Sequence, residues 1–207
     1  NIAVGMEGAP GHQAAELRKA DDRGSYPAWV YARGAYGRGF PTMGGFDQMT
    51  AIVGGFWDAM LGEGRRWWIT ANSDSHIHYT EGGIDFWPGE YSKTFVHAEK
   101  THDGILESMR AGRMFVVTGD LITALDVTLS DGVTSVGWGE TLKTKLGSKL
   151  TLEIAVTDPE ETNAAGRNPL LNRIDLIMGA VTGPQENVDL AQNPTTGVVE
   201  RVSREAF

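Results

Sequence analysis

The chain has 207 residues, which is long enough to bury a sizeable hydrophobic core in one large or two small domains. Its 18 Lys and Arg residues are outnumbered by 27 Asp and Glu residues, and the net charge of -9, without any basic block, argues against nucleic acid as a partner. There is no cysteine, so disulfides and thiolate metal sites are excluded, and any metal ion must be bound by His, Asp and Glu.

The sequence shows neither a membrane segment nor a targeting signal. No apolar run approaches the roughly 20 residues needed to cross a bilayer, and residues 1–5 lack the basic region of a signal peptide. We expect a soluble protein that does not bind a membrane, and the sequence does not distinguish the cytoplasm from the periplasm. Because residues 2–7 read as a buried strand with no lead-in and residues 201–207 lack a terminating signal, we expect a piece of a longer protein.

Strand and helix patterns alternate as far as Gly119. Between the strand at 2–7 and residue 45, Gly, Arg and aromatic residues are crowded into a stretch that we interpret as an active-site loop, because long irregular loops are often functional. Apolar residues at helical spacing predict an amphipathic helix over 49–60. The further predicted elements are a strand at 67–72, a loop at 73–88, a strand at 92–97, a helix at 105–110 capped by Thr101 or Asp103 and closed by Gly112, and a strand at 114–118.

Beyond Gly119 the pattern changes to strands separated by turn residues, without a strong helix. Residues 150–156 alternate as a half-buried strand does. The predicted strands are 122–129, 133–138, 150–157, 173–178 and 198–202. We therefore predict two domains, an α/β domain over 1–119 and an all-β, sandwich-like domain over 120–207.

The segment 67–76 is the most informative part of the chain. An apolar, β-prone run ends there in small polar residues followed by Asp74 and His76. These two residues are two positions apart, so on a continuing strand both side chains would project from the same face. A carboxylate oxygen and a neutral imidazole nitrogen together suit a divalent cation, and strand ends at the mouth of an α/β barrel deliver such ligands. The alternative is that Asp74 caps a loop and His76 packs at its base.

Two segments carry a family resemblance. Residues 71–76 read Ala-Asn-Ser-Asp-Ser-His, and residues 104–119 form a predicted helix that ends in Ala-Gly-Arg before a strand. Both resemble the PHP superfamily, the polymerase and histidinol phosphatase-like metal-dependent phosphoesterases, in which a serine-aspartate-x-histidine segment is the last metal-binding motif. The resemblance covers about the first 120 residues.

This resemblance implies a fold and a function. The fold would be the C-terminal part of a PHP-like, TIM-like (β/α)7-type barrel, here followed by the β domain. The function would be a metal-dependent hydrolase, a phosphoesterase that uses metal-activated water on a small phosphorylated or ester substrate. Asp74 and His76 would be catalytic metal ligands in a site that holds up to three divalent ions, Zn, Mn, Fe or Mg. Whether the chain forms homo-oligomers stays open.

Three further polar residues are candidates for the site. Glu7 and His12 lie at the end of the first predicted strand and in the loop behind it, where barrel enzymes place functional groups. Glu7 resembles the glutamate that PHP proteins place near the metals, so we predict a catalytic role for Glu7 and a substrate-binding role for His12. His78 forms a His-x-His pair with His76, but it comes too late in the chain for an opening motif, so we predict substrate contact.

The predicted active-site loop, between the first strand and residue 45, is also rich in arginine. Arginine binds phosphate oxygens in a bidentate manner, so one or two of these residues would hold a phosphate group of the substrate. We select Arg33 and Arg38 as substrate-binding candidates. The alternative is that they are solvated surface residues.

The sequence also departs from the family. A complete PHP site draws on an early His-x-His, two further histidines and a glutamate from strands that would precede Asn1. We therefore expect this chain to bind metal weakly and to be inactive or nearly so, unless another copy or a separate chain supplies those strands. Two alternative functions stay open, an amidohydrolase-type enzyme that cleaves C–N bonds and a non-catalytic binding module with a degenerate barrel. The absence of Gly-x-Ser-x-Gly and His-Glu-x-x-His weakens serine hydrolase and metalloprotease interpretations.

Overall fold

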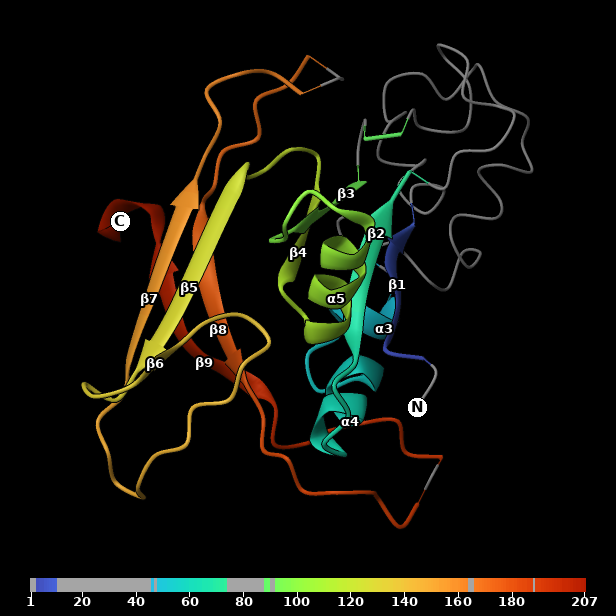
Figure 1. The fold of residues 1–207 in the computed structure, drawn as a ribbon, viewed down its shortest axis with the longest axis vertical. Coiled ribbons are helices and arrows are strands. Elements are labelled where there is room, and N and C mark those ends of the chain that lie inside the picture. The colour runs from blue at the N-terminus through green and yellow to red at the C-terminus, as the bar shows by residue number, and fades with distance from the viewer. Residues whose placement is uncertain are drawn as a thin grey trace.

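The computed structural model describes residues 3–10, 46, 48–73, 88–89, 92–163, 166–187 and 189–207 (Figure 1). The described elements of the first half are β1 (Gly5–Pro10), α3 (Gln48–Ala51), α4 (Phe56–Gly62), β2 (Trp68–Asn72), β3 (Ser92–Val96), α5 (His102–Ala111) and β4 (Met114–Thr118). Those of the second half are β5 (Ala124–Ser130), β6 (Ser135–Val136), β7 (Thr151–Thr157), β8 (Arg173–Met178), β9 (Gly197–Ser203) and the 3-10 helix η3 (Arg204–Ala206).

The described residues of the first half form two small sheets. β1 and β2 pair in parallel, from Gly5 opposite Trp68 to Pro10 opposite Asn72, with an irregularity between Glu7 and Ala9. β3 and β4 pair antiparallel. The hydroxyl of Thr94 on β3 accepts a hydrogen bond from the Ala71 N–H and donates one to the Ala71 carbonyl, both at 2.8 Å. The Thr94 side chain therefore links β3 to the backbone of β2, a strand of the other sheet.

Helix α5 follows the local signals of its sequence. Thr101 precedes it in an extended conformation, and its hydroxyl accepts a hydrogen bond from the Gly104 N–H at 3.0 Å, so Thr101 rather than Asp103 is the N-cap. Gly112 ends the helix in the left-handed conformation with a φ of 77°. The end of α5 lies on β2, because the Trp68 indole N–H donates to the Arg110 carbonyl at 3.0 Å.

The prediction of one continuous helix over 49–60 is wrong. The chain forms two short helices, α3 and α4, with Gly54 and Gly55 between them. Gly54 has a φ of 79°, and its N–H donates to Asp58 Oδ2 at 2.6 Å. Apolar spacing does not reveal such a turn, because a left-handed glycine breaks the helix without changing the pattern of apolar residues.

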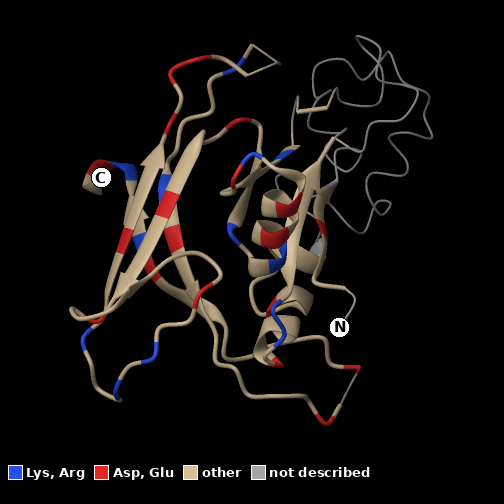
Figure 2. Ribbon diagram, in the orientation of Figure 1, with Lys and Arg blue, Asp and Glu red and all other residues tan. Residues whose placement is uncertain are grey.

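The second half consists of antiparallel strands. One sheet has the order β6-β5-β7, and β8 and β9 form a two-stranded sheet. Asp158, just after β7, accepts hydrogen bonds from the Leu171 N–H at 3.1 Å and from Arg204 Nη1 at 3.2 Å, which ties the two sheets together at one end. Figure 2 shows acidic and basic residues interspersed along these strands. The strand predicted at 133–138 is reduced to the two residues of β6.

Aromatic rings and the side chain of Asn193 both join the described residues of the two halves. Phe95 and Phe115 stack with ring centroids 4.8 Å apart, and Trp138 packs edge-on against Phe115 at 5.2 Å. The connection between β8 and β9 passes beside α4, as Figure 1 shows, where Asn193 Nδ2 donates to the carbonyls of Asp58 and Ala180. The predicted domain boundary near residue 120 stays a prediction.

The predicted (β/α)7-type, PHP-like and TIM-like barrel is wrong. Over the residues that the structure describes, the sheets are small and open, and β1 with β2 is the single parallel pair. In a barrel each strand–helix–strand unit places its two strands in parallel. Here β3, α5 and β4 form such a unit in sequence, yet β3 and β4 lie antiparallel. The alternation of strand and helix patterns is the same for both arrangements, so the sequence did not distinguish them.

None of the helices in the described part of the chain is long and apolar enough to cross a membrane.

Candidate functional site

The pairing of β1 with β2 brings together three polar side chains, which we call the Glu7 cluster: Glu7, Thr70 and Asn72. Glu7 lies within β1, three residues before its end, rather than at the end of the first strand as the sequence predicted. Glu7 lies opposite Thr70 in the parallel register, and Asn72 follows on the same face of β2. Glu7 Oε2 accepts a hydrogen bond from the Thr70 hydroxyl at 3.0 Å and one from Asn72 Nδ2 at 2.7 Å. The two donors therefore hold the carboxylate in one orientation.

The other oxygen of this carboxylate is different. Glu7 Oε1 is buried and has no hydrogen-bond partner among the described residues. A buried, unpaired carboxylate oxygen is costly, because the lost hydration is not replaced by a donor or a positive charge. A cation beside Oε1 would remove this cost, and in this carboxylate Oε1 is the one oxygen left to act as a ligand.

Close backbone packing sets the position of Glu7. The irregularity in the β1–β2 pairing falls at Gly8, and a Cβ there would lie 3.0 Å from Ile69 Cβ and 3.1 Å from Thr50 Cγ2. The Thr50 hydroxyl also donates to the Gly8 carbonyl at 2.9 Å. A side chain at position 8 would press on Ile69 and Thr50, which favours glycine between β2 and α3, and the strand holds Glu7 next to it.

Of the site residues predicted from the sequence, the structure describes Glu7 alone. Six lie outside the described residues, and their predicted roles stay predictions: His12, Arg33, Arg38, Asp74, His76 and His78. Within the ranges that the structure covers, no three His, Asp or Glu residues are grouped as metal ligands. What the structure adds is that Glu7 lies opposite Thr70 and accepts a hydrogen bond from Asn72, the last residue of β2, after which the sequence runs through Ser73 into Asp74.

Sequence reasoning missed two residues of the cluster, Thr70 and Asn72. They are 63 and 65 positions from Glu7, so their contact depends on the pairing of β1 with β2. One signal was present in the sequence. Both are polar residues, alternating on one face at the end of an otherwise apolar strand, where an exposed or functional edge is expected.

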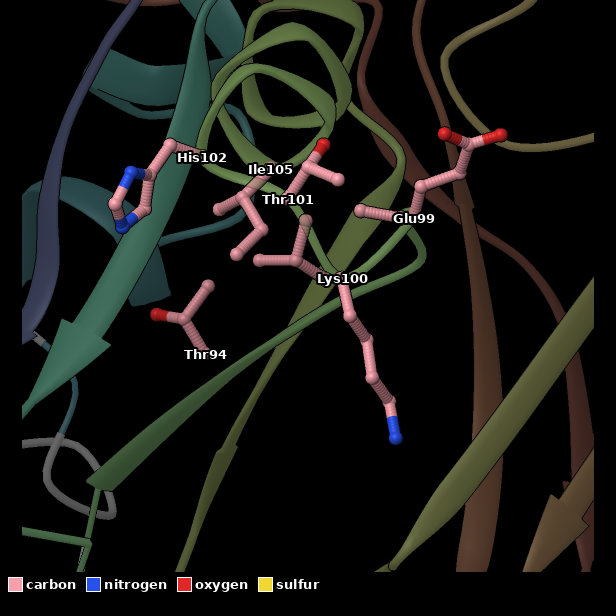
Figure 3. A pocket seen from close by; sticks show the side chains of 8 residues that line it. Thr94, Glu99, Lys100, Thr101, His102 and Ile105 are labelled. Carbon is pink, nitrogen blue, oxygen red and sulfur yellow. The ribbon is translucent and has the colours of Figure 1, made fainter.

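Described residues of β2, β3 and α5 line two cavities. One, of ≈ 520 Å³, is lined in part by Asn72 and Ser73 at the end of β2 and by Ser92 at the start of β3. The other, of ≈ 790 Å³, lies at the start of α5 (Figure 3). In Figure 3 the side chains of Glu99 and Lys100 point away from His102, so the titratable groups of this second cavity do not converge. We therefore place the candidate site at the Glu7 cluster, between β1 and β2.

Comparison with known proteins adds no relative. No protein family model, no curated protein and no solved structure matches this chain. The resemblance to the PHP superfamily therefore rests on the quoted residues alone.

Proposed function

We propose that this chain carries part of the active site of a metal-dependent hydrolase of the phosphoesterase type. The observation that supports it is the Glu7 carboxylate, with one oxygen held by Thr70 and Asn72 and the other buried without a partner. The second support is the Ser-Asp-x-His sequence at 73–76, which begins directly after β2 and resembles the last PHP metal-binding motif.

The proposed ligands are Glu7, Asp74 and His76. Carboxylate oxygens with an imidazole nitrogen form a ligand set that suits divalent Zn, Mn or Fe, and Mg is accepted where carboxylates dominate. When bound, such an ion supplies Lewis-acid polarisation of the ester and activation of a water molecule.

The neighbouring residues of the chain have a positioning role in this proposal. Thr70 and Asn72 donate to the same oxygen of Glu7, which keeps the other oxygen directed away from them. Outer hydrogen bonds of this kind orient ligand carboxylates, and removing one commonly weakens metal affinity by about 10–100-fold. We expect Asn72 to matter more than Thr70, because its hydrogen bond is the shorter, at 2.7 Å against 3.0 Å.

Metal binding by the chain is the direct test. Isothermal titration with Zn²⁺ and with Mn²⁺ should show saturable binding, which Glu7→Gln weakens at least about tenfold and the Asp74→Ala, His76→Ala double variant abolishes. Glu153→Gln, which changes an exposed carboxylate on β7, is the matched control and should bind as the parent does. Equal affinity in the parent, Glu7→Gln and the double variant would contradict the proposal.

Turnover separates the reaction classes. Because the resemblance implies further ligands from other strands, turnover is measured in the product of the full-length gene, with an aryl phosphate and with a cyclic amide as substrates. Metal-dependent release from the aryl phosphate, lost in the double variant, supports a phosphoesterase. Cleavage of the cyclic amide alone points to the amidohydrolase alternative, and a double variant that loses neither metal nor any measured activity points to a binding module.

A further inference from the structure

Two loop tips next to the β6-β5-β7 sheet expose apolar side chains fully to solvent. Val133, in the turn between β5 and β6, is 93% exposed, and Leu146, in the loop between β6 and β7, is 107% exposed. These are the two highest exposed fractions among the large apolar residues that the structure describes. A single exposed apolar residue is ordinary on a protein surface, and two become a site only where they lie together.

The two tips belong to the same end of the sheet. Ser130, the last residue of β5, pairs with Thr151, the first residue of β7, so the β5–β6 turn and the end of the β6–β7 loop are adjacent. Asp131 in the turn accepts a hydrogen bond from the Thr134 N–H at 2.8 Å. That bond, and with it a hydrogen bond from the Thr144 side chain of the loop, lowers the pKa of Asp131 below its ordinary value. The Asp131 carboxylate therefore ties the loop to the turn.

A tight turn directs Leu146 outward. The Ser148 N–H donates to the Lys145 carbonyl at 3.1 Å, and Gly147 has a φ of 84°, which fits a type II turn with glycine at its third position. Leu146 occupies the second position, at the corner of this turn. A Cβ on Gly147 would have no heavy atom within 4 Å, so the corner stands clear of the rest of the described protein.

The same loop carries positive charge in an acidic chain. Between Glu140 and Glu153 there are three lysines and no acidic residue, namely Lys143, Lys145 and Lys149. All three are exposed, and none takes part in an ion pair with a described residue. Figure 2 shows basic residues along this loop. Because salt screens charges more than about 8 Å apart, a surface that approaches the loop meets these lysines and not the net charge of the chain.

Apolar tips among lysines fit one kind of partner. Protein interfaces are depleted in lysine and bury about 800 Å² on each side, which two turn corners do not provide. An anionic lipid surface attracts lysines and accepts apolar side chains at the boundary between headgroups and acyl chains.

We propose that this end of the sheet docks on an anionic lipid surface, with Leu146 and Val133 below the headgroups and the three lysines against them. The sequence-based expectation of no membrane binding rested on the lack of an apolar span of roughly 20 residues, and contact through loop tips needs no such span.

The test is co-sedimentation of the chain with sucrose-loaded vesicles of phosphatidylcholine, alone or with about 30% phosphatidylserine, at up to about 5 mM lipid. We expect saturable binding that requires phosphatidylserine and weakens as the salt concentration rises. The triple variant Lys143→Gln, Lys145→Gln, Lys149→Gln should bind about a hundredfold more weakly, at about fivefold for each lysine. All three positions are exposed, so the variant should keep the parent's circular dichroism spectrum and melting temperature.

The matched control removes the same charge from exposed residues of the first half, as Arg66→Gln, Lys100→Gln, Arg110→Gln, and should bind as the parent does. Insertion has its own measurement. Because the chain has no cysteine, Leu146→Cys can carry a single nitrobenzoxadiazole label, whose emission should shift to the blue on vesicles that contain phosphatidylserine. The same label on Val181→Cys, at a position 70% exposed between β8 and β9, should not shift.

Three results would overturn the proposal. They are no sedimentation with phosphatidylserine vesicles at the highest lipid concentration, equal binding by the parent and the lysine variant, and equal emission shifts from the two labels. Self-association without vesicles, seen by analytical ultracentrifugation and lost in the lysine variant, would assign the surface to a second copy of the chain and would also overturn it.

Discussion

Asn193 allows a prediction whose size follows from the structure. It lies in the connection between β8 and β9, and it is 3% exposed. Its amide Nδ2 donates to the Ala180 carbonyl at 3.1 Å and to the Asp58 carbonyl of α4 at 3.3 Å. Its Oδ1 accepts from the Thr195 N–H at 3.1 Å and from the Thr195 hydroxyl at 2.6 Å. One side chain therefore joins the β-rich half to a helix 135 positions earlier in the chain.

Asn193→Ala should destabilise the protein by about 3 kcal/mol, since each of these hydrogen bonds contributes about 0.5–1.5 kcal/mol and the long one to Asp58 contributes least. The backbone at Gly62 packs directly against the Asn193 amide, since a Cβ on Gly62 would lie 2.5 Å from Asn193 Nδ2. Removing the amide therefore leaves an empty space beside α4, which adds to the loss of stability. At about 2–4 °C per kcal/mol for a chain of this size, the melting temperature should fall by about 6–12 °C.

The assay is urea unfolding followed by far-UV circular dichroism, with a thermal melt as the second measurement. Asn168→Ala is the control, because Asn168 is exposed and its side chain donates, among the described residues, one hydrogen bond, from Nδ2 to the Glu160 carbonyl at 3.2 Å. Its effect should stay within about 0.5 kcal/mol. An Asn193→Ala variant as stable as this control would refute the conclusion that the β8–β9 connection is fastened to α4.

Three other predictions follow. Ser92→Ala should stabilise the protein by about 1 kcal/mol, because it removes a buried hydroxyl without a described partner, and a melting temperature below that of the parent would contradict this. Gly112→Ala should destabilise it by well over about 1 kcal/mol, since Gly112 has a φ of 77° and its Cβ would lie 2.5 Å from the Trp68 ring; chemical denaturation measures the change, and a neutral result would argue against this contact. The hydrogen bond from Arg201 and the nearby positive charges hold the pKa of Asp175 below its ordinary value of 3.8. A carboxyl group whose pKa is lower in the folded than in the unfolded protein stabilises the fold at pH values above the unfolded-state pKa, and this contribution is lost as the pH falls below about 4. Asp175→Asn should therefore flatten the acid limb of a curve of unfolding free energy against pH. An unchanged acid limb would contradict this.

The parts of the fold that local chemistry determines were predictable. Helix α5 begins after a threonine cap and ends before a left-handed glycine, and both signals are residues directly next to the helix in the sequence. The strands predicted at 92–97, 114–118, 150–157 and 173–178 correspond to β3, β4, β7 and β8 within a residue at either end. Each of these segments carries its own apolar pattern, so no distant part of the chain is needed to recognise it.

The arrangement of the elements was not predictable in the same way. Whether β3 and β4 run parallel or antiparallel depends on how the chain returns after α5, and the two arrangements share one pattern of apolar residues. The break between α3 and α4 likewise depends on the conformation of a single glycine, Gly54. A resemblance that is limited to short motifs does not supply this information, and the barrel that it implied was wrong.

The sequence by itself determined the chemical inventory of this protein: acidic, without cysteine, with Asp74 and His76 two positions apart after an apolar segment, and with Glu7 after another short apolar run. Only the tertiary structure decided that Glu7 meets Thr70 and Asn72, and that Ser92 is buried without a described partner. The physical reason is that residue types and short-range periodicity are local properties. Strand pairing, burial and the satisfaction of each polar atom are decided between segments that lie far apart in the chain.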